Sequence, residues 1–234
     1  MKKLATFGLL SIMATSMANA APVAMPSNGG NGFEFSNWYI GGRVALNMLS
    51  WTNEYDYGGD PLALAASSKD EFSFETIFGG NIYAGAEFNA FDITFRGEIE
   101  GGMMGRFSDQ DQGFEFKMTV PYLIANAYYD FTDGWLRDGW YAGAGLGIAL
   151  PKTELDNAFF ADGDRSERGI SPMFALMFGW SYDLNEQFAL DLRYRLATFM
   201  GTEHKRMFTD GYMMTNDIGW IWENSFALGI RYKF

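Results

Sequence analysis

Apolar and polar side chains alternate with a period of two along most of the chain beyond residue 37. The clearest example is the segment in which Phe91, Ile93 and Phe95 are separated by Asp92 and Thr94. Strict alternation of this kind is typical of a β-strand with one face in an apolar environment and the other in a polar one. The pattern predicts eight strands, at residues 38–49, 72–88, 91–104, 114–131, 140–149, 170–183, 188–199 and 218–234.

The connections between these strands alternate in length. Short connections lie near residues 89–90, 132–139 and 184–187. Longer and more polar connections lie near residues 50–71, 105–113, 150–169 and 200–217. Short turns at one end and long loops at the other, joined by an even number of strands, are typical of transmembrane barrels. We therefore expect an all-β fold, an eight-stranded antiparallel up-and-down transmembrane β-barrel with both termini at the short-turn end.

The polar faces of the predicted strands carry acidic and basic residues in near balance. In a membrane barrel these faces point inward, where an unpaired charge is unfavourable, so the two signs should compensate each other. The predicted interior charges are Arg43, Glu87, Asp92, Arg96, Glu98, Glu100, Asp183, Asp191, Arg193, Arg195, Arg231 and Lys233. Two interpretations stay open: a structural ladder of ion pairs, or a gate whose pairs exchange to open a narrow channel. Because eight strands enclose a lumen that side chains fill, we expect no continuous wide pore.

Aromatic residues on the apolar faces gather near both ends of the strands. Near the short-turn end are Trp38, Phe88, Phe91, Phe131, Trp140, Tyr182, Phe188 and Phe234. Near the long-loop end are Trp51, Phe72, Phe114, Phe174, Phe199, Trp220 and Trp222. Two aromatic belts with aliphatic residues between them match the two interfaces of a bilayer. The alternative, a soluble β-sandwich, would place large aromatic residues in the centre of its core.

The composition agrees with a barrel and excludes other classes. Aromatic residues make up 18% of the chain and glycine occurs 28 times, and both suit closed sheets at a membrane interface. The chain has no cysteine, which excludes disulfides and a cysteine-linked lipid anchor. A net charge of −12 argues against nucleic acid as a partner, since phosphates require a basic surface.

The first twenty residues have the pattern of an export signal. Lys2 and Lys3 precede a short apolar run that ends at Ala18, Asn19 and Ala20, a small-x-small cleavage site. The apolar run is too short to span a membrane as a helix. We therefore predict a signal peptide at 1–20, a flexible periplasmic segment at 21–36 and the barrel at 37–234.

Several motifs resemble the opacity-protein and surface-antigen superfamily of outer-membrane barrels, which overlaps the OmpA-type transmembrane domain. They are Trp38-Tyr39-Ile40-Gly41, the run from Ala125 to Phe131, and the run from Trp140 to Gly147. The alternating ending resembles the signal read by the barrel-assembly machinery, and comprises Phe226, Leu228, Ile230, Tyr232 and Phe234. The resemblance implies an outer-membrane location in a Gram-negative cell. It also implies contact with outer-membrane lipid or lipopolysaccharide, and with periplasmic chaperones during assembly. The superfamily is functionally mixed, so it does not fix an activity.

Candidate chemistry is sparse. The single histidine, His204, stands beside Glu203, but no serine is spaced to complete a nucleophilic site. Asp162-Gly163-Asp164 offers oxygen ligands for calcium, but the rest of a calcium-loop pattern is missing and the sequence favours a turn. We predict no cofactor, no metal and no catalysis.

The long loops suggest contact with a partner. They carry apolar clusters around Leu62, Phe159 and Met213, and exposed apolar tips can mark an external ligand or host surface. The favoured hypothesis is a surface-exposed structural or interaction protein. A narrow porin-like channel for small solutes is the alternative, and a lipid-modifying enzyme is a third.

Overall fold

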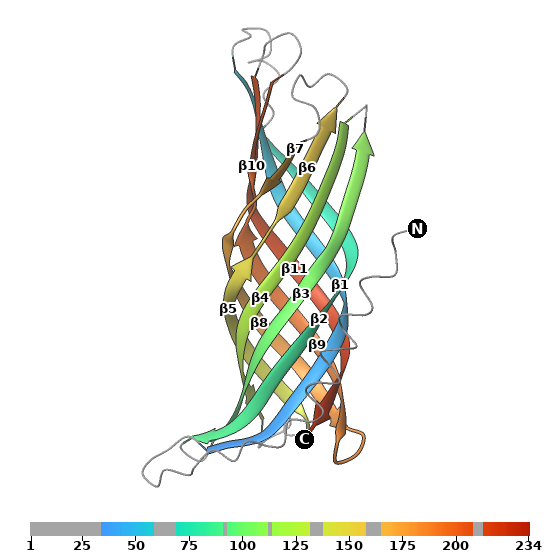
Figure 1. Cartoon of the computed structure of the whole chain (residues 1–234), viewed down its shortest axis with the longest axis vertical. Helices are drawn as coiled ribbons and strands as arrows, with labels where there is room; N and C mark the ends of the chain where they lie inside the picture. The colour runs from blue at the N-terminus through green and yellow to red at the C-terminus, as the bar shows by residue number, and fades with distance from the viewer. Residues whose placement is uncertain are drawn as a thin grey trace.

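The computed structural model describes residues 34–58, 69–90, 93–111, 114–131, 138–157, 165–207 and 213–234. These residues are nearly all in strands, which form one tall cylinder (Figure 1). The strands are β1 (Glu34–Gly58), β2 (Lys69–Ala90), β3 (Ile93–Asp111), β4 (Phe114–Asp130), β5 (Trp140–Ala149), β6 (Lys152–Asn157), β7 (Arg165–Arg168), β8 (Ser171–Asp183), β9 (Phe188–Met200), β10 (Glu203–Met207) and β11 (Met213–Lys233). Among the same residues we find no helix with the length and apolarity needed to cross a membrane.

The segments amount to eight strands that run the length of the barrel. Three of these strands are interrupted once, between β5 and β6, between β7 and β8, and between β9 and β10. Every pairing is antiparallel, and β1 pairs with both β2 and β11, which closes the sheet on itself. The predicted eight-stranded antiparallel barrel is confirmed.

The predicted ends of the strands were wrong at the long-loop end. Strand β1 continues to Gly58 and β11 begins at Met213, so the hairpins extend well past the expected limits of 49 and 218. The alternation weakens there because both faces carry polar residues, yet backbone pairing continues. At the other end β1 begins at Glu34, paired with Asn89. The predicted signal peptide and most of the predicted segment 21–36 lie outside the described residues.

The long-hairpin end is divided into two sheets. Pairing of β2 with β3 ends at Gly80 and Met103, and pairing of β8 with β9 ends at Phe174 and Thr198. Beyond these points the described strands form two four-stranded sheets, in the orders β2-β1-β11-β10 and β3-β4-β6-β7. Figure 1 shows these ends separating into two groups at the top of the barrel.

A proline helps to explain the break between β8 and β9. Pro172 has no N–H to donate to a neighbouring strand. The adjacent Ser171 compensates in part, because its hydroxyl accepts a hydrogen bond from the Met200 backbone N–H at 2.7 Å. The local sequence therefore accounts for the end of the pairing between β8 and β9 at this position.

The outer face is apolar over the middle of the barrel. Phe78 is 82% exposed and Val44 is 70% exposed, and aliphatic side chains of every neighbouring strand point outward with them. Burial of the charged face and exposure of the apolar one is the reverse of a soluble protein. The assignment of Trp51 and Phe199 to the outer aromatic belt was wrong, because both side chains point into the lumen and are buried. The alternation continues through both positions, since Leu49 and Ala197 beside them also face inward.

Tyrosines fill the lumen by lying over glycines of the neighbouring strand. Tyr83 is paired with Gly41, and a Cβ on that glycine would stand 2.3 Å from the ring. The same relation holds for the pairs Tyr39–Gly85, Tyr128–Gly143 and Tyr141–Gly179. Any larger residue would clash with the ring, so the high glycine content follows from a lumen that is narrow and packed.

Candidate functional site

The lumen has two tiers of different chemistry. Toward the short-turn end and the middle, most of the large inward side chains are charged or carry a hydroxyl. Toward the long-hairpin end most of them are apolar. The change occurs along single strands: on β3, Arg96, Glu98 and Glu100 give way to Met104 and Phe107. We call these the charged tier and the apolar tier.

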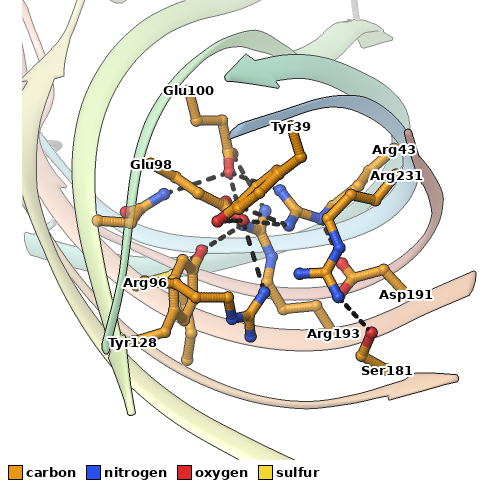
Figure 2. A network of polar contacts seen from close by, with 12 residues as sticks. Tyr39, Arg43, Arg96, Glu98, Glu100, Tyr128, Ser181, Asp191, Arg193 and Arg231 are labelled. Carbon is orange, nitrogen blue, oxygen red and sulfur yellow. Dashed lines mark hydrogen bonds and ion pairs between the residues drawn. The ribbon is translucent and has the colours of Figure 1, made fainter. Parts of the chain in front are cut away.

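Arg43 on β1 connects three carboxylates of the charged tier (Figure 2). Its guanidinium donates to Asp191 at 2.6 Å, to Glu98 at 3.2 Å and to Glu100 at 3.2 Å. It also lies 3.6 Å from the centroid of the Tyr83 ring. Charge-assisted bonds of this kind are the strong ones, and all four of the charged side chains are buried.

Glu100 on β3 is the second centre of the network. It accepts hydrogen bonds from Arg193 at 3.0 Å and from Arg195 at 2.9 Å, both from β9 on the opposite wall. The Tyr122 hydroxyl donates to it at 2.7 Å. Because β3 and β9 are not neighbours in the sheet, these bonds cross the lumen and leave little room between the walls.

Residues that the sequence interpretation missed complete the charged tier. Glu223 on β11 is fully buried and accepts from Arg195 at 2.8 Å. Asp130 accepts from Arg96 at 2.7 Å, and the Tyr141 hydroxyl donates to Asp191 at 2.9 Å. Glu223 stands on the same alternating face as Arg231, so continuing the alternation toward the long-hairpin end would have found it.

The other predicted network residues lie at the short-turn rim. Lys233 forms an ion pair with Asp183 at 2.7 Å, and half-buried Glu87 accepts from the Asn37 amide at 2.7 Å. Arg231 is buried and donates to the Ser181 hydroxyl at 2.6 Å. Asp92 lies outside the described residues. The structure thus brings together most of the predicted interior charges, while Glu87 and Lys233 stand apart from the central cluster.

The apolar tier fills the lumen above the charges. Its large members are Leu49, Trp51, Ile77, Met104, Phe107, Met118, Val120, Met173, Phe199, Ile218 and Ile221. Trp51 meets Phe107 edge to face at 5.9 Å between centroids, which joins the two separate sheets. The Thr153 and Thr202 hydroxyls, 2.7 Å apart, join them again.

The remaining candidates do not assemble into a reactive site within the residues that the structure places. His204 lies on β10, opposite Asn216 of β11. No group of three or more metal-binding side chains occurs among those residues. Asp162-Gly163-Asp164 and the apolar clusters at Leu62 and Phe159 lie outside them. In the predicted assembly signal, Phe226, Leu228 and Ile230 are exposed on the outer face of β11, Tyr232 is partly exposed, and Phe234 directly follows the strand. The role of these residues stays a prediction.

Several solved structures resemble the chain. The chain resembles Neisserial surface protein A (17% identity, covering 86% of this chain and 99% of that one, TM-score 0.47). It also resembles AlkL (15% identity, 90% and 95%, TM-score 0.45) and OprG from Pseudomonas aeruginosa (14% identity, 86% and 97%, TM-score 0.43). No curated protein sequence matches the chain.

The family assignment rests on the sequence profile of the outer membrane protein beta-barrel domain. That profile matches residues 7–234, nearly the whole chain. It agrees with the closed antiparallel barrel, the apolar outer face and the charged lumen described above. The resemblance seen in the motifs is thereby confirmed. This chain belongs to the outer-membrane β-barrel domain family, and it is an outer-membrane protein.

Proposed function

We propose that this barrel is a non-catalytic, surface-exposed structural and interaction protein without an open aqueous pore. The observation that carries the proposal is the filled lumen, in which ion pairs cross from wall to wall beneath a layer of apolar side chains. In this family short turns face the periplasm, so the two separate sheets would stand at the cell surface.

The two tiers argue against conduction for different reasons. An ion moving through the charged tier would have to separate pairs such as Arg43–Asp191 and Arg193–Glu100, and breaking a buried pair costs about 3–5 kcal/mol. An ion in the apolar tier would lose its hydration among side chains that offer few polar groups in exchange, and two of those, the Thr153 and Thr202 hydroxyls, are bonded to each other. Both tiers would have to rearrange for the channel alternative to hold.

The two surface sheets supply the interaction part of the proposal. Each has four strands, and the described edges at β2, β3, β7 and β10 lack a partner from the opposing sheet. Strand edges and hairpin tips held on a rigid barrel are suited to contact another molecule. The partner class that we favour is a host-cell or matrix surface.

Planar-bilayer recording tests the absence of a pore. The mature protein and an Arg96→Ala variant should both give no single-channel events in symmetric salt. A Phe199→Ala variant, which thins the apolar tier, should remain silent because the charged tier persists. Reproducible unitary events from the unaltered protein would overturn the proposal in favour of a narrow channel.

Loop exchange tests the interaction. Replacing residues 59–68 by a short Gly-Ser linker should abolish adhesion of expressing cells to host cells or matrix, whereas a linker in the short turn at 184–187 should not. Adhesion that survives exchange of all long hairpin tips would contradict the role. A change in lipid A mass on expression, lost in His204→Ala, would instead support the enzyme alternative.

A further inference from the structure

We propose that the periplasmic end of the charged tier binds one small monovalent inorganic anion of the halide class, held between Arg96 and Arg231. The site lies where the structure leaves buried positive donors without protein acceptors. It goes beyond the proposed function, since a silent structural barrel requires no ion.

Two guanidinium groups have unused donors there. Both arginines are buried, at 1% and 4% exposure. Arg96 uses its Nε for Asp130, and neither Nη1 nor Nη2 makes a hydrogen bond. Arg231 uses Nη2 for Ser181, and neither Nε nor Nη1 makes one. Figure 2 shows both groups on the side of the network away from Glu100. Buried donors without acceptors are costly, so an acceptor of another kind is expected.

The neighbouring carboxylates are already engaged by other donors. Asp191 accepts from Arg43 and Tyr141, and Glu98 accepts from Arg43 and Tyr39. Glu98 approaches Arg96 Nη1 only to 3.9 Å, which is beyond hydrogen-bond distance. Among the described residues, therefore, no carboxylate oxygen lies within hydrogen-bond distance of the four remaining nitrogens.

The balance of buried charge points the same way. The buried charged side chains in the described part of the lumen are Arg43, Arg96, Arg193, Arg195 and Arg231 against Glu98, Glu100, Asp191 and Glu223. The fifth carboxylate, Asp130, has a side chain that is 32% exposed, so water screens part of its charge. One monovalent anion would restore neutrality in the buried region.

The size and charge of the ligand follow from its surroundings. Glu98, Asp130 and Asp191 stand close by, and repulsion from them grows with the charge of the ligand. A phosphate dianion would give the buried region an excess of negative charge, whereas one halide matches the single excess arginine. The rings of Tyr39 and Tyr141 lie over the two guanidinium groups, 5.0 Å from Arg231 and 4.6 Å from Arg96, and for so crowded a lumen we assign a compact ion.

Thermal unfolding in detergent micelles tests the site. Chloride is exchanged for gluconate at constant ionic strength, so screening is unchanged while a bulky anion replaces the small one. The Tm of the unaltered protein should rise with chloride concentration, because a ligand that binds only the folded state stabilises it. Arg231→Gln should remove this dependence. Lys233→Gln, a rim cation already paired with Asp183, should keep it.

A second measurement guards against loss of folding in Arg231→Gln. The ³⁵Cl NMR line should broaden in the presence of the unaltered protein and Lys233→Gln, and bromide should reverse the broadening by competition. Equal Tm in chloride and gluconate, or equal broadening by folded Arg231→Gln, would overturn the proposal and leave water as the acceptor.

Discussion

The two tiers of the lumen fill the same cylinder by opposite means. In the charged tier, long polar side chains reach across the lumen and satisfy one another, as Glu100 does with Arg193 and Arg195. In the apolar tier, rings and thioethers pack without direction, as Trp51 does against Phe107. The stability of the charged tier depends on the presence of each bonding partner, whereas the stability of the apolar tier depends on how well side-chain volume fills the lumen. The lumen of a small barrel can therefore be filled at two levels by different interactions, electrostatic complementarity at one and packing at the other.

Removing one partner from the charged tier should give the largest effect. Glu100→Gln leaves Arg193 and Arg195 facing a neutral amide, and an uncompensated buried charge costs about 3–5 kcal/mol. We expect a loss near the upper end of that range in urea unfolding of the reconstituted protein. Glu87→Gln at the rim is the control and should change the free energy of unfolding by about 1 kcal/mol or less. Similar losses for both variants would contradict the distinction between interior and rim.

Truncation in the apolar tier should have the next largest effect. Phe199→Ala creates a cavity beside Ile221 in the apolar tier, and such truncations cost about 3 kcal/mol or somewhat more. The matched control is Phe226→Ala, whose ring is 52% exposed on the outer face of the neighbouring strand and should cost less. The free energy of unfolding measured in vesicles decides the order. If Phe226→Ala lowered the free energy of unfolding more than Phe199→Ala, contacts at the lipid face would contribute more to stability than packing in the lumen.

The hydroxyl bridge between the two surface sheets should have the smallest effect. Thr153→Val leaves the Thr202 hydroxyl without this contact, and one neutral hydrogen bond contributes about 1 kcal/mol. Hydrogen exchange should rise at β6 and β10 while the central strands keep their protection. Ser108→Ala, at an exposed position on β3, is the control and should leave exchange unchanged. Faster exchange throughout the barrel in Thr153→Val would show that the bridge holds more than the two sheets.

The sequence located most of the charged tier because alternation and charge coincide there. Arg96, Glu98 and Glu100 are separated by small or apolar residues, so the charged positions of the strand indicate which face points inward. The apolar tier was misassigned because its inward residues have the same chemistry as the outward ones. Residue type alone predicts Trp51 and Phe199 as membrane-interface aromatics, and only their position in the alternation separates them from that class.

Alternation and charge along the chain are enough to predict the antiparallel barrel and the face that carries charge. Both follow from a period of two and from the cost of placing charge in lipid, which are local properties of each strand. Only the folded barrel shows which charges meet, that the lumen is filled in two tiers, and that the long-hairpin end divides into two sheets. Those features depend on register and on closure, which bring β3 opposite β9 and carry Glu100 across to Arg193. Alternation within one strand carries no information about the strand on the far wall.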